Sequence, residues 1–286
     1  MESQKQFKPT FSFELFPPKT EDGMAKLQTA VKKLRAVNPL YFSVTYGAGG
    51  STQGRTFQTV DWLVSQGIDT APHLSCIGSS KAEITEILTR YKDQGINRIV
   101  ALRGDLPSGA GLGGLGELNY ANELVQLIRA EFGDHFHIEV AAYPEFHPQA
   151  ASAQADLRNF KRKVEAGANA AITQYFYNPD AYFRFVDSCE KLGVNIPVVP
   201  GIMPISNYSS LVRFSDACGA EIPRWVRKRM DGFGDDQESV KAFGLEVVTS
   251  LCERLLEKGA PGLHFYTMNQ SALPLRIWND LGLPGS

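Results

Sequence analysis

The sequence predicts an α/β fold, because short apolar runs alternate with patterns typical of amphipathic helices. The runs are rich in β-branched and aromatic residues, the composition of parallel strands that are buried on both faces. Several helical patterns end in a glycine just before the next run, where a left-handed residue stops a helix. The eight predicted strands cover residues 11–16, 40–46, 70–76, 98–104, 138–143, 170–176, 197–202 and 262–267.

Periodicity and capping signals place helices between the predicted strands. Ser80 and Glu83 have the spacing of a capping box, in which each side chain hydrogen-bonds the backbone of the other residue. The interval between the last two strands is longer than the others, and within it residues 222–230 predict an extra helix before the helix around residues 240–256. One apolar helix face after the first strand is formed by Met24, Leu27, Val31 and Leu34.

Strand–helix units with short connections form either an open doubly wound sheet or a closed barrel, and eight strands is the number that closes a parallel barrel. An open dinucleotide-binding sheet would carry Gly-x-Gly-x-x-Gly after its first strand, but residues 17–20 are Pro-Pro-Lys-Thr. The glycines of residues 109–116 follow the fourth strand and have the composition of a loop. We therefore expect residues 1–286 to form a single catalytic (β/α)8 TIM barrel with an extra helix before the last barrel helix, and residues 1–10 to be a flexible N-terminus.

Composition excludes several classes of function. The chain has 29 Lys and Arg against 31 Asp and Glu, a net charge of -2, which argues against binding to nucleic acid. It has neither an apolar run long enough to span a membrane nor the apolar core of a signal peptide at its start. The four cysteines lie far apart, which suits a reducing compartment without a disulfide framework or a zinc site. We expect a cytoplasmic protein that binds neither nucleic acid nor membrane.

Polar side chains gather where the predicted strands end. In a parallel barrel the functional site is built from the carboxyl ends of the strands and the loops that follow them. Arg103 and Asp105 end the fourth strand, and because uncompensated buried charge is costly, we expect them to face a cleft. The polar residues at strand ends are Glu14, Thr45, His73, Arg103, Asp105, Tyr143, Glu145, His147, Gln174, His264 and Tyr266.

Glu14, Asp105 and a run of three basic residues each have two competing explanations. Glu14 lies among aromatic residues, an environment that favours the protonated carboxyl and makes it a candidate general acid, but it could instead pair with a cation. Asp105 could cap a loop by accepting hydrogen bonds from backbone N–H groups. Lys161, Arg162 and Lys163 could hold a diphosphate or form a solvated helix face. The residues alone leave each of these alternatives open.

Signals for metal or covalent catalysis are weak. His135 and His137 would point to one face of a strand, but they lie at the start of the fifth strand, on the end of the barrel opposite the site. No lysine lies in a strand end for Schiff-base chemistry, and no serine nucleophile elbow is present. We expect no metal. A cavity with an acid, a second carboxylate, amide and hydroxyl donors and aromatic rings suits a bound redox cofactor instead.

Eight segments, in order and spacing over about residues 11–270, resemble the bacterial methylenetetrahydrofolate reductases. They are FSFELFPPK, FSVTYGAGGS, APHLSC, IVALRGDLP, AAYPEFHPQA, AITQYFY, PGIMPISNY and HFYTMN. The resemblance implies a (β/α)8 barrel that binds FAD and reduces 5,10-methylenetetrahydrofolate to 5-methyltetrahydrofolate with NADH, or with NADPH. It further implies ping-pong hydride transfer through FAD, a role in one-carbon metabolism and methionine supply, and a homo-oligomer.

The resemblance also assigns residues, position by position. Glu14 matches the general acid, Asp105 the carboxylate between flavin and folate, and Gln174 an amide that contacts folate and nicotinamide in turn. Further substrate contacts are expected at Thr45, Ser210, Phe214, Tyr266 and Gln270. Flavin contacts are expected at Thr45, Tyr46, Ala48, His73, Arg103, Gly104, Asp105, Ala121, Tyr143, His147, Ala150, Asp156, Asn159, Arg162 and Lys163.

Gln270 is a departure from the family pattern, because an arginine that contacts folate often stands there. An amide cannot make the bidentate, charge-assisted contact of a guanidinium group. The sequence therefore leaves open how folate is anchored at this position.

The chemistry of this reaction fits the candidate residues. The methylene bridge of the folate must open to a 5-iminium cation, which needs an acid such as Glu14 and is stabilised by a carboxylate such as Asp105. Two other functions remain open. One is a pterin- or folate-binding barrel that transfers methyl groups without flavin, and the other is a non-catalytic folate-binding barrel.

Overall fold

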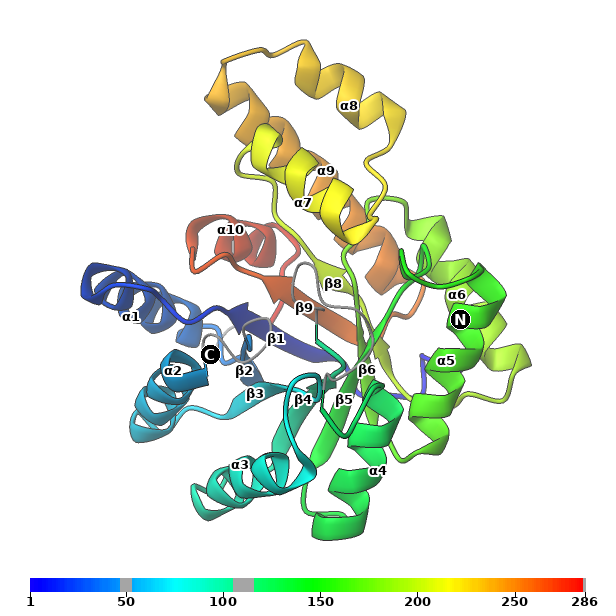
Figure 1. Cartoon of the computed structure of the whole chain (residues 1–286). Helices are drawn as coiled ribbons and strands as arrows, with labels where there is room; N and C mark the ends of the chain where they lie inside the picture. The colour runs from blue at the N-terminus through cyan, green and yellow to red at the C-terminus, as the bar shows by residue number, and fades with distance from the viewer. Residues whose placement is uncertain (47–52, 105–115, 285–286) are drawn as a thin grey trace.

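The strands of the computed structural model form one parallel sheet that closes into a barrel, with helices around its outside (Figure 1). The structure describes residues 1–46, 53–104 and 116–284. The described strands are β1 (Thr10–Leu15), β2 (Tyr41–Val44), β3 (Thr70–Ser75), β4 (Arg98–Leu102), β5 (His137–Ala142), β6 (Ala170–Thr173), β7 (Val198–Val199), β8 (Gly201–Ile202) and β9 (Gly262–Tyr266). Their positions confirm the predicted barrel.

The barrel closes through one short segment of chain. The order of strands in the sheet is β7-β6-β5-β4-β3-β2-β1-β9-β8, so β7 and β8 are its two ends. Both belong to the predicted strand of residues 197–202, and they are divided at Pro200, which has no N–H to donate. Val198 and Val199 pair with β6, whereas Gly201 and Ile202 pair with β9. One continuous segment therefore joins the two ends of the sheet.

The helices lie outside this barrel and follow the strands in turn. The described helices are α1 (Glu21–Arg35), α2 (Gln53–Ser65), α3 (Lys81–Asp93), α4 (Ala121–Phe132), α5 (Ala153–Glu165), α6 (Pro179–Lys191), α7 (Tyr208–Cys218), α8 (Arg224–Asp231), α9 (Gln237–Glu257) and α10 (Ala272–Asp280). Within the described ranges, no helix is long and apolar enough to cross a membrane.

The extra helix predicted before the last barrel helix is present as α8, but the structure adds a further helix, α7, before it. Helix α7 has its own local signals: the Asn207 side chain accepts a hydrogen bond from Ser210 N, and Gly219 ends the helix in a left-handed conformation with φ 75°. Figure 1 shows α7, α8 and α9 together at one side of the barrel, at the top of the view. The prediction of a single extra helix was therefore incomplete.

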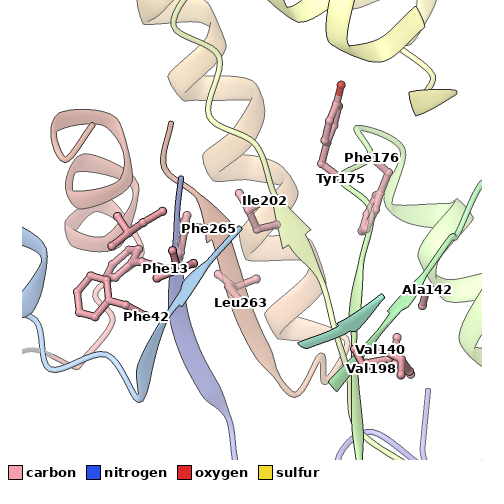
Figure 2. Packing of buried hydrophobic residues seen from close by; sticks show 14 of the residues in the cluster. Phe13, Phe42, Val140, Ala142, Tyr175, Phe176, Val198, Ile202, Leu263 and Phe265 are labelled. Carbon is pink, nitrogen blue, oxygen red and sulfur yellow. The ribbon is translucent and has the colours of Figure 1, made fainter. Parts of the chain in front are cut away.

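The main hydrophobic core lies between the barrel and its helices. The ring of Phe13 packs 5.7 Å from Phe42, 5.6 Å from Phe265 and 5.6 Å from Trp278, measured between ring centroids. Figure 2 shows Phe13, Phe42 and Phe265 side by side on neighbouring strands. Because side chains alternate across a strand, their sequence neighbours Ser12, Glu14 and His264 point to the other face, into the barrel.

The N-terminal segment, residues 1–10, which the sequence predicts to be flexible, contacts α6 and the residues around β7. The α-amino group of Met1 lies 2.8 Å from Asp187 Oδ1 and 3.1 Å from Glu190 Oε1, both on α6. The buried Gln4 side chain accepts a hydrogen bond from Val198 N at 2.8 Å and donates one to Ile196 O at 3.2 Å. These contacts satisfy backbone groups around β7, and the flexibility of the segment stays a prediction.

Candidate active site

Two adjoining cavities lie at the carboxyl ends of the strands. The larger has a volume of about 440 Å³ and the smaller about 260 Å³. Leu102, Ala141 and Tyr143 line both cavities, so the two share a wall. This end of a parallel barrel is where functional sites are built. The smaller cavity is lined by Glu14, His73, Val100, Leu102, Ala141, Tyr143, Ile172, Gln174, Tyr175, Met203 and Tyr266.

Glu14 brings a carboxyl group into the smaller cavity from the end of β1. Its Oε2 lies 3.4 Å from His73 Nε2 and 3.7 Å from His264 Nε2, so two imidazoles converge on one carboxyl oxygen. The Glu14 side chain is 18% exposed, whereas the side chain of His264 is completely buried. Burial lowers the pKa of His73, and the nearby carboxylate of Glu14 opposes that shift. His73 is therefore a neutral neighbour of this acid near pH 7.

Tyr266 fixes one side of the smaller cavity. Its hydroxyl donates to Thr173 O at 2.7 Å, and its pKa is raised well above the usual range by burial and by the charge of Glu14. Gly201 makes room for this ring, because a Cβ there would lie 2.6 Å from Tyr266 Cε2 and 2.1 Å from Thr173 O. The Tyr266 phenol is therefore neutral and held in one position in the wall of the smaller cavity.

Gln174 places an amide at the end of β6. Its backbone N donates to Ala142 O at 2.8 Å, which continues the pairing of β5 and β6 by one residue. Its side-chain Oε1 accepts a hydrogen bond from Tyr175 N at 3.0 Å. An amide has two N–H donors besides this oxygen, so the Gln174 side chain can donate to a ligand in the cavity.

The larger cavity has a basic side that comes from α5. Asp156, Asn159 and Lys163 recur at the spacing of one helix face, and Arg162 lines the same cavity. Lys163 Nζ donates to Ala141 O, and burial lowers the pKa of Lys163 to about 8 against the opposing effect of Asp156. The ammonium group is therefore poorly compensated and would gain from an anion.

The chain turns sharply after β4 and carries Arg103 into the larger cavity. Gly104 has a φ of +90°, and a Cβ there would lie 1.8 Å from Ser75 Oγ, so only glycine fits at this crossing. Ser75 Oγ donates to Arg103 O at 2.8 Å and holds the turn against β3. The guanidinium group of Arg103 donates to Gln149 Oε1 and, at 3.3 Å, to Gly104 O.

Most of the positions that the sequence predicts as flavin contacts line this one cavity, although they come from five separate segments. They are Tyr46, Arg103, Gly104, Ala121, Tyr143, His147, Ala150, Asp156, Asn159, Arg162 and Lys163. His73 lines the smaller cavity instead. Ala48 and Asp105 lie outside the described residues.

The predicted catalytic and substrate positions divide into two groups. Glu14, Gln174 and Tyr266 meet in the smaller cavity. The other four are not among the residues lining either cavity: Thr45 continues the pairing of β1 and β2, Ser210 and Phe214 lie on α7, and Gln270 is exposed in the turn after β9.

Sequence reasoning also missed residues that line the cavities. Tyr175 and Met203 line the smaller cavity. Tyr175 lies near the end of the predicted strand of residues 170–176, and Met203 directly follows the predicted strand of residues 197–202, so their positions could have indicated them. Tyr120 and Gln149 line the larger cavity from loops. Gln149 is placed there by its hydrogen bond with Arg103, a contact across 46 residues that no local pattern indicates.

Comparison with known proteins gives a consistent answer. The family described as "Methylenetetrahydrofolate reductase" matches residues 1–282. The chain is 42% identical over 276 residues to the 5,10-methylenetetrahydrofolate reductase of Escherichia coli K12, which covers 96% of this chain and 91% of that protein. It is 40% identical over 285 residues to a rice protein named "Probable methylenetetrahydrofolate reductase (NADH)", covering 96% of this chain and 48% of that protein.

Solved structures support the fold. An uncharacterised protein from Clostridium thermocellum, described as binding two copies of 5-methyl-5,6,7,8-tetrahydrofolic acid, superposes with a TM-score of 0.68 at 17% identity, over 98% of this chain and 95% of that one. At this identity the likeness concerns the barrel alone. The family match and the 42% identity to the bacterial enzyme carry the assignment: the chain belongs to the methylenetetrahydrofolate reductase family and reduces 5,10-methylenetetrahydrofolate to 5-methyltetrahydrofolate in one-carbon metabolism.

Proposed function

We propose that this chain carries out the reduction with FAD held in the larger cavity, and that folate and nicotinamide use the smaller cavity in turn. The family is flavin-dependent. FAD, when bound, takes a hydride from the reduced nicotinamide and gives it to the folate. The observation that supports the proposal most is the shared wall between a cavity with cations and a cavity with an acid and an amide.

The residues of the larger cavity fit a flavin dinucleotide. Its volume of about 440 Å³ is typical of cofactor sites, which range over roughly 300–1,000 Å³. Arg162 and Lys163 would hold the diphosphate. Burial lowers the pKa of Lys163, and a bound anion would favour its charged ammonium form. Tyr143 and Leu102 in the shared wall would contact the ring system that has to serve both cavities.

Glu14 is the proposed general acid. As the methylene bridge opens, one C–N bond breaks, its electron pair stays on the leaving nitrogen, and that nitrogen takes the proton of the Glu14 carboxyl group. The carbon left behind is a 5-iminium cation, and the family resemblance assigns its counter-charge to Asp105. Glu14 is left as a carboxylate and has to regain one proton in every cycle.

The smaller cavity, at about 260 Å³, favours binding of one ring system at a time. The nicotinamide and the pterin each need their reacting carbon roughly 3–3.5 Å from the same flavin ring. Donor and acceptor would therefore alternate, which is ping-pong kinetics, and the Gln174 amide would serve the carboxamide of one and the pterin of the other by turning over.

The simplest test is spectroscopic. We expect purified protein to be yellow and to lose its flavin absorbance when NADH is added without oxygen, and to regain it when 5,10-methylenetetrahydrofolate follows. A colourless protein that nevertheless binds folate would contradict the proposal and support one of the flavin-free alternatives. The rice relative is named for NADH, which supports NADH over NADPH as donor. The homo-oligomer stays a prediction, which sedimentation velocity can test.

A further inference from the structure

The end of β1, which carries Glu14, is held by a side chain of the turn that follows β9. Glu14 and Tyr266 are the last pair in register between β1 and β9. The next amide bond, from Thr267 N to Glu14 O, is long at 3.4 Å, whereas the Thr267 hydroxyl donates to the same oxygen at 2.6 Å. Amide hydrogen bonds are usually shorter than about 3.2 Å, so the hydroxyl makes the stronger contact with this carbonyl group.

Asn269 makes a similar contact two residues further along β1. Its Oδ1 accepts a hydrogen bond from Phe16 N at 3.0 Å, and its Nδ2 donates to Phe16 O at 2.9 Å. A side-chain amide has the same donor and acceptor as a peptide group, so Asn269 takes the place of a neighbouring strand. The backbone itself turns here, since Gln270 N donates to Thr267 O at 2.9 Å. Side chains therefore extend the pairing of β1 with β9 as far as the residue before Pro17.

The turn that presents these two side chains has an unfavourable backbone. Met268 and Asn269 are consecutive residues with φ 50° and φ 56°, a left-handed conformation that is uncommon outside glycine and that asparagine tolerates better than methionine. The Thr267 hydroxyl stabilises the turn, because it accepts a hydrogen bond from Asn269 N at 3.1 Å while it donates to Glu14 O. Thr267 is 3% exposed. One buried hydroxyl thus joins the turn to the backbone of Glu14.

Stability alone is a poor explanation for this arrangement. The two hydrogen bonds between Phe16 and Asn269 lie at the surface, where water could replace them at a small net cost. The segment is also held from its other edge by β2, because Glu14 pairs in register with Ser43 and Thr45 N donates to Leu15 O at 2.9 Å. Backbone strain of this kind gathers at functional sites. Here it accompanies a second set of bonds around the proposed acid.

We propose that Thr267 and Asn269 are positioning residues, which hold the end of β1 so that the Glu14 carboxyl group reaches the leaving nitrogen of the folate. The proposal rests on the acid role proposed for Glu14. In the part of the chain that the structure describes, neither Thr267 nor Asn269 lines either cavity, so their effect passes through the backbone of residues 14–16. Such an effect can be large, since a misplacement of about 1 Å can cost about 10²-fold in rate.

The first test compares Thr267→Val with the matched control Thr70→Val. Both changes replace a buried threonine by a residue of the same shape without the hydroxyl, but Thr70 lies at the start of β3, at the opposite end of the barrel, where its hydroxyl donates to Ile68 O at 2.9 Å. In stopped flow we expect the folate half-reaction of Thr267→Val to fall about tenfold, while NADH reduces the flavin at the wild-type rate. Thr70→Val should match the wild type in both half-reactions. Thr267→Ser keeps the hydroxyl and should recover most of the rate.

A double-mutant cycle with Glu14→Gln separates positioning from a general structural role. If the Thr267 hydroxyl acts through the acid, Thr267→Val should slow the folate half-reaction about tenfold in the wild-type background and not at all in Glu14→Gln. A residue that only supports the fold or the folate site would slow both backgrounds equally. The apparent Kd for folate should stay unchanged in Thr267→Val, because the loss concerns proton transfer and not binding.

Asn269→Gly provides a second variant in case Thr267→Val does not fold. Glycine adopts a φ of 56° readily, so this change removes both bonds to Phe16 without adding backbone strain. Its matched control is Asn38→Gly, because Asn38 has a φ of 49° in the connection between α1 and β2. We expect a loss of about threefold in the folate half-reaction, again absent in the Glu14→Gln background, since Asn269 contacts the chain two residues beyond Glu14.

A Thr267→Val enzyme that matches Thr70→Val in the folate half-reaction would overturn the proposal. A loss that Thr267→Ser shares, or one that is equal with and without the Glu14 carboxyl group, would also overturn it. A Glu14→Gln enzyme that reduces folate at the wild-type rate would instead contradict the acid role in the proposed function, so the two failures are distinguishable.

Discussion

The two cavities meet at the same three residues but are built differently. The larger draws its polar groups from loops and from one face of α5, with Arg162 and Lys163 at its basic side. The smaller takes its polar groups from strands: Glu14 is paired in register with Ser43 and Tyr266, and Gln174 extends the pairing of β5 and β6. We infer that a cavity that only binds a cofactor can take its polar groups from loops, whereas a cavity for proton transfer needs groups that the hydrogen bonds between strands hold in position.

The largest effect expected from this contrast is at Glu14. Glu14→Gln removes the acid and keeps the shape of the side chain, so we expect the folate half-reaction to fall by about 10²–10⁴-fold while NADH still reduces the bound flavin. Stopped-flow measurement of each half-reaction separates the two. Equal damage to both would mean that Glu14 shapes the cavity and does not supply the proton.

A smaller effect is expected in the larger cavity. Lys163→Met should weaken FAD binding about 10- to 100-fold, because a charge-assisted hydrogen bond is lost. Lys161→Met is the matched control, since Lys161 lies on the same helix but pairs with Glu165 at 3.5 Å and does not line the cavity. Fluorescence titration of flavin-stripped protein gives the two affinities. Similar losses in both variants would contradict a specific contact at Lys163.

The same lysine predicts a pH dependence. Burial lowers the pKa of Lys163 to about 8, so without an anion its charge is lost as the pH rises through that value. FAD binding restores the charge, takes up a proton, and should weaken with increasing pH above about 8. Lys163→Met should remove this slope. A wild-type affinity that is constant from pH 7 to pH 9.5 would contradict the role given to the ammonium group.

The smallest effect is expected at Gln174. Gln174→Glu keeps one acceptor but removes the N–H donors, so we expect the folate half-reaction to suffer more than the nicotinamide one, by a factor of about ten. Separate measurement of the apparent Kd for each ligand in stopped flow checks this. If Gln174→Glu lost nicotinamide binding while its Kd for folate stayed unchanged, the larger role of Gln174 toward folate would be contradicted.

The sequence predicted the strands well because buried parallel strands are short apolar runs, and their polar ends indicated Glu14, Gln174 and Tyr266. It failed where the structure depends on distant contacts. Gln4 docks on residues 196 and 198, and Gln149 meets Arg103, but neither pair leaves a periodic signal. The contact between Ser12 and His264 was missed as well, since the two residues are 252 positions apart and come together only through the pairing of β1 with β9.

The most direct test of the account is the order of ligand binding, because it depends on one small cavity that serves both reactants. Initial rates should be measured while NADH and 5,10-methylenetetrahydrofolate are varied together. The account predicts parallel lines in the double-reciprocal plot, as donor and acceptor alternate. Lines that intersect, with a ternary complex detected by equilibrium binding, would contradict the shared site.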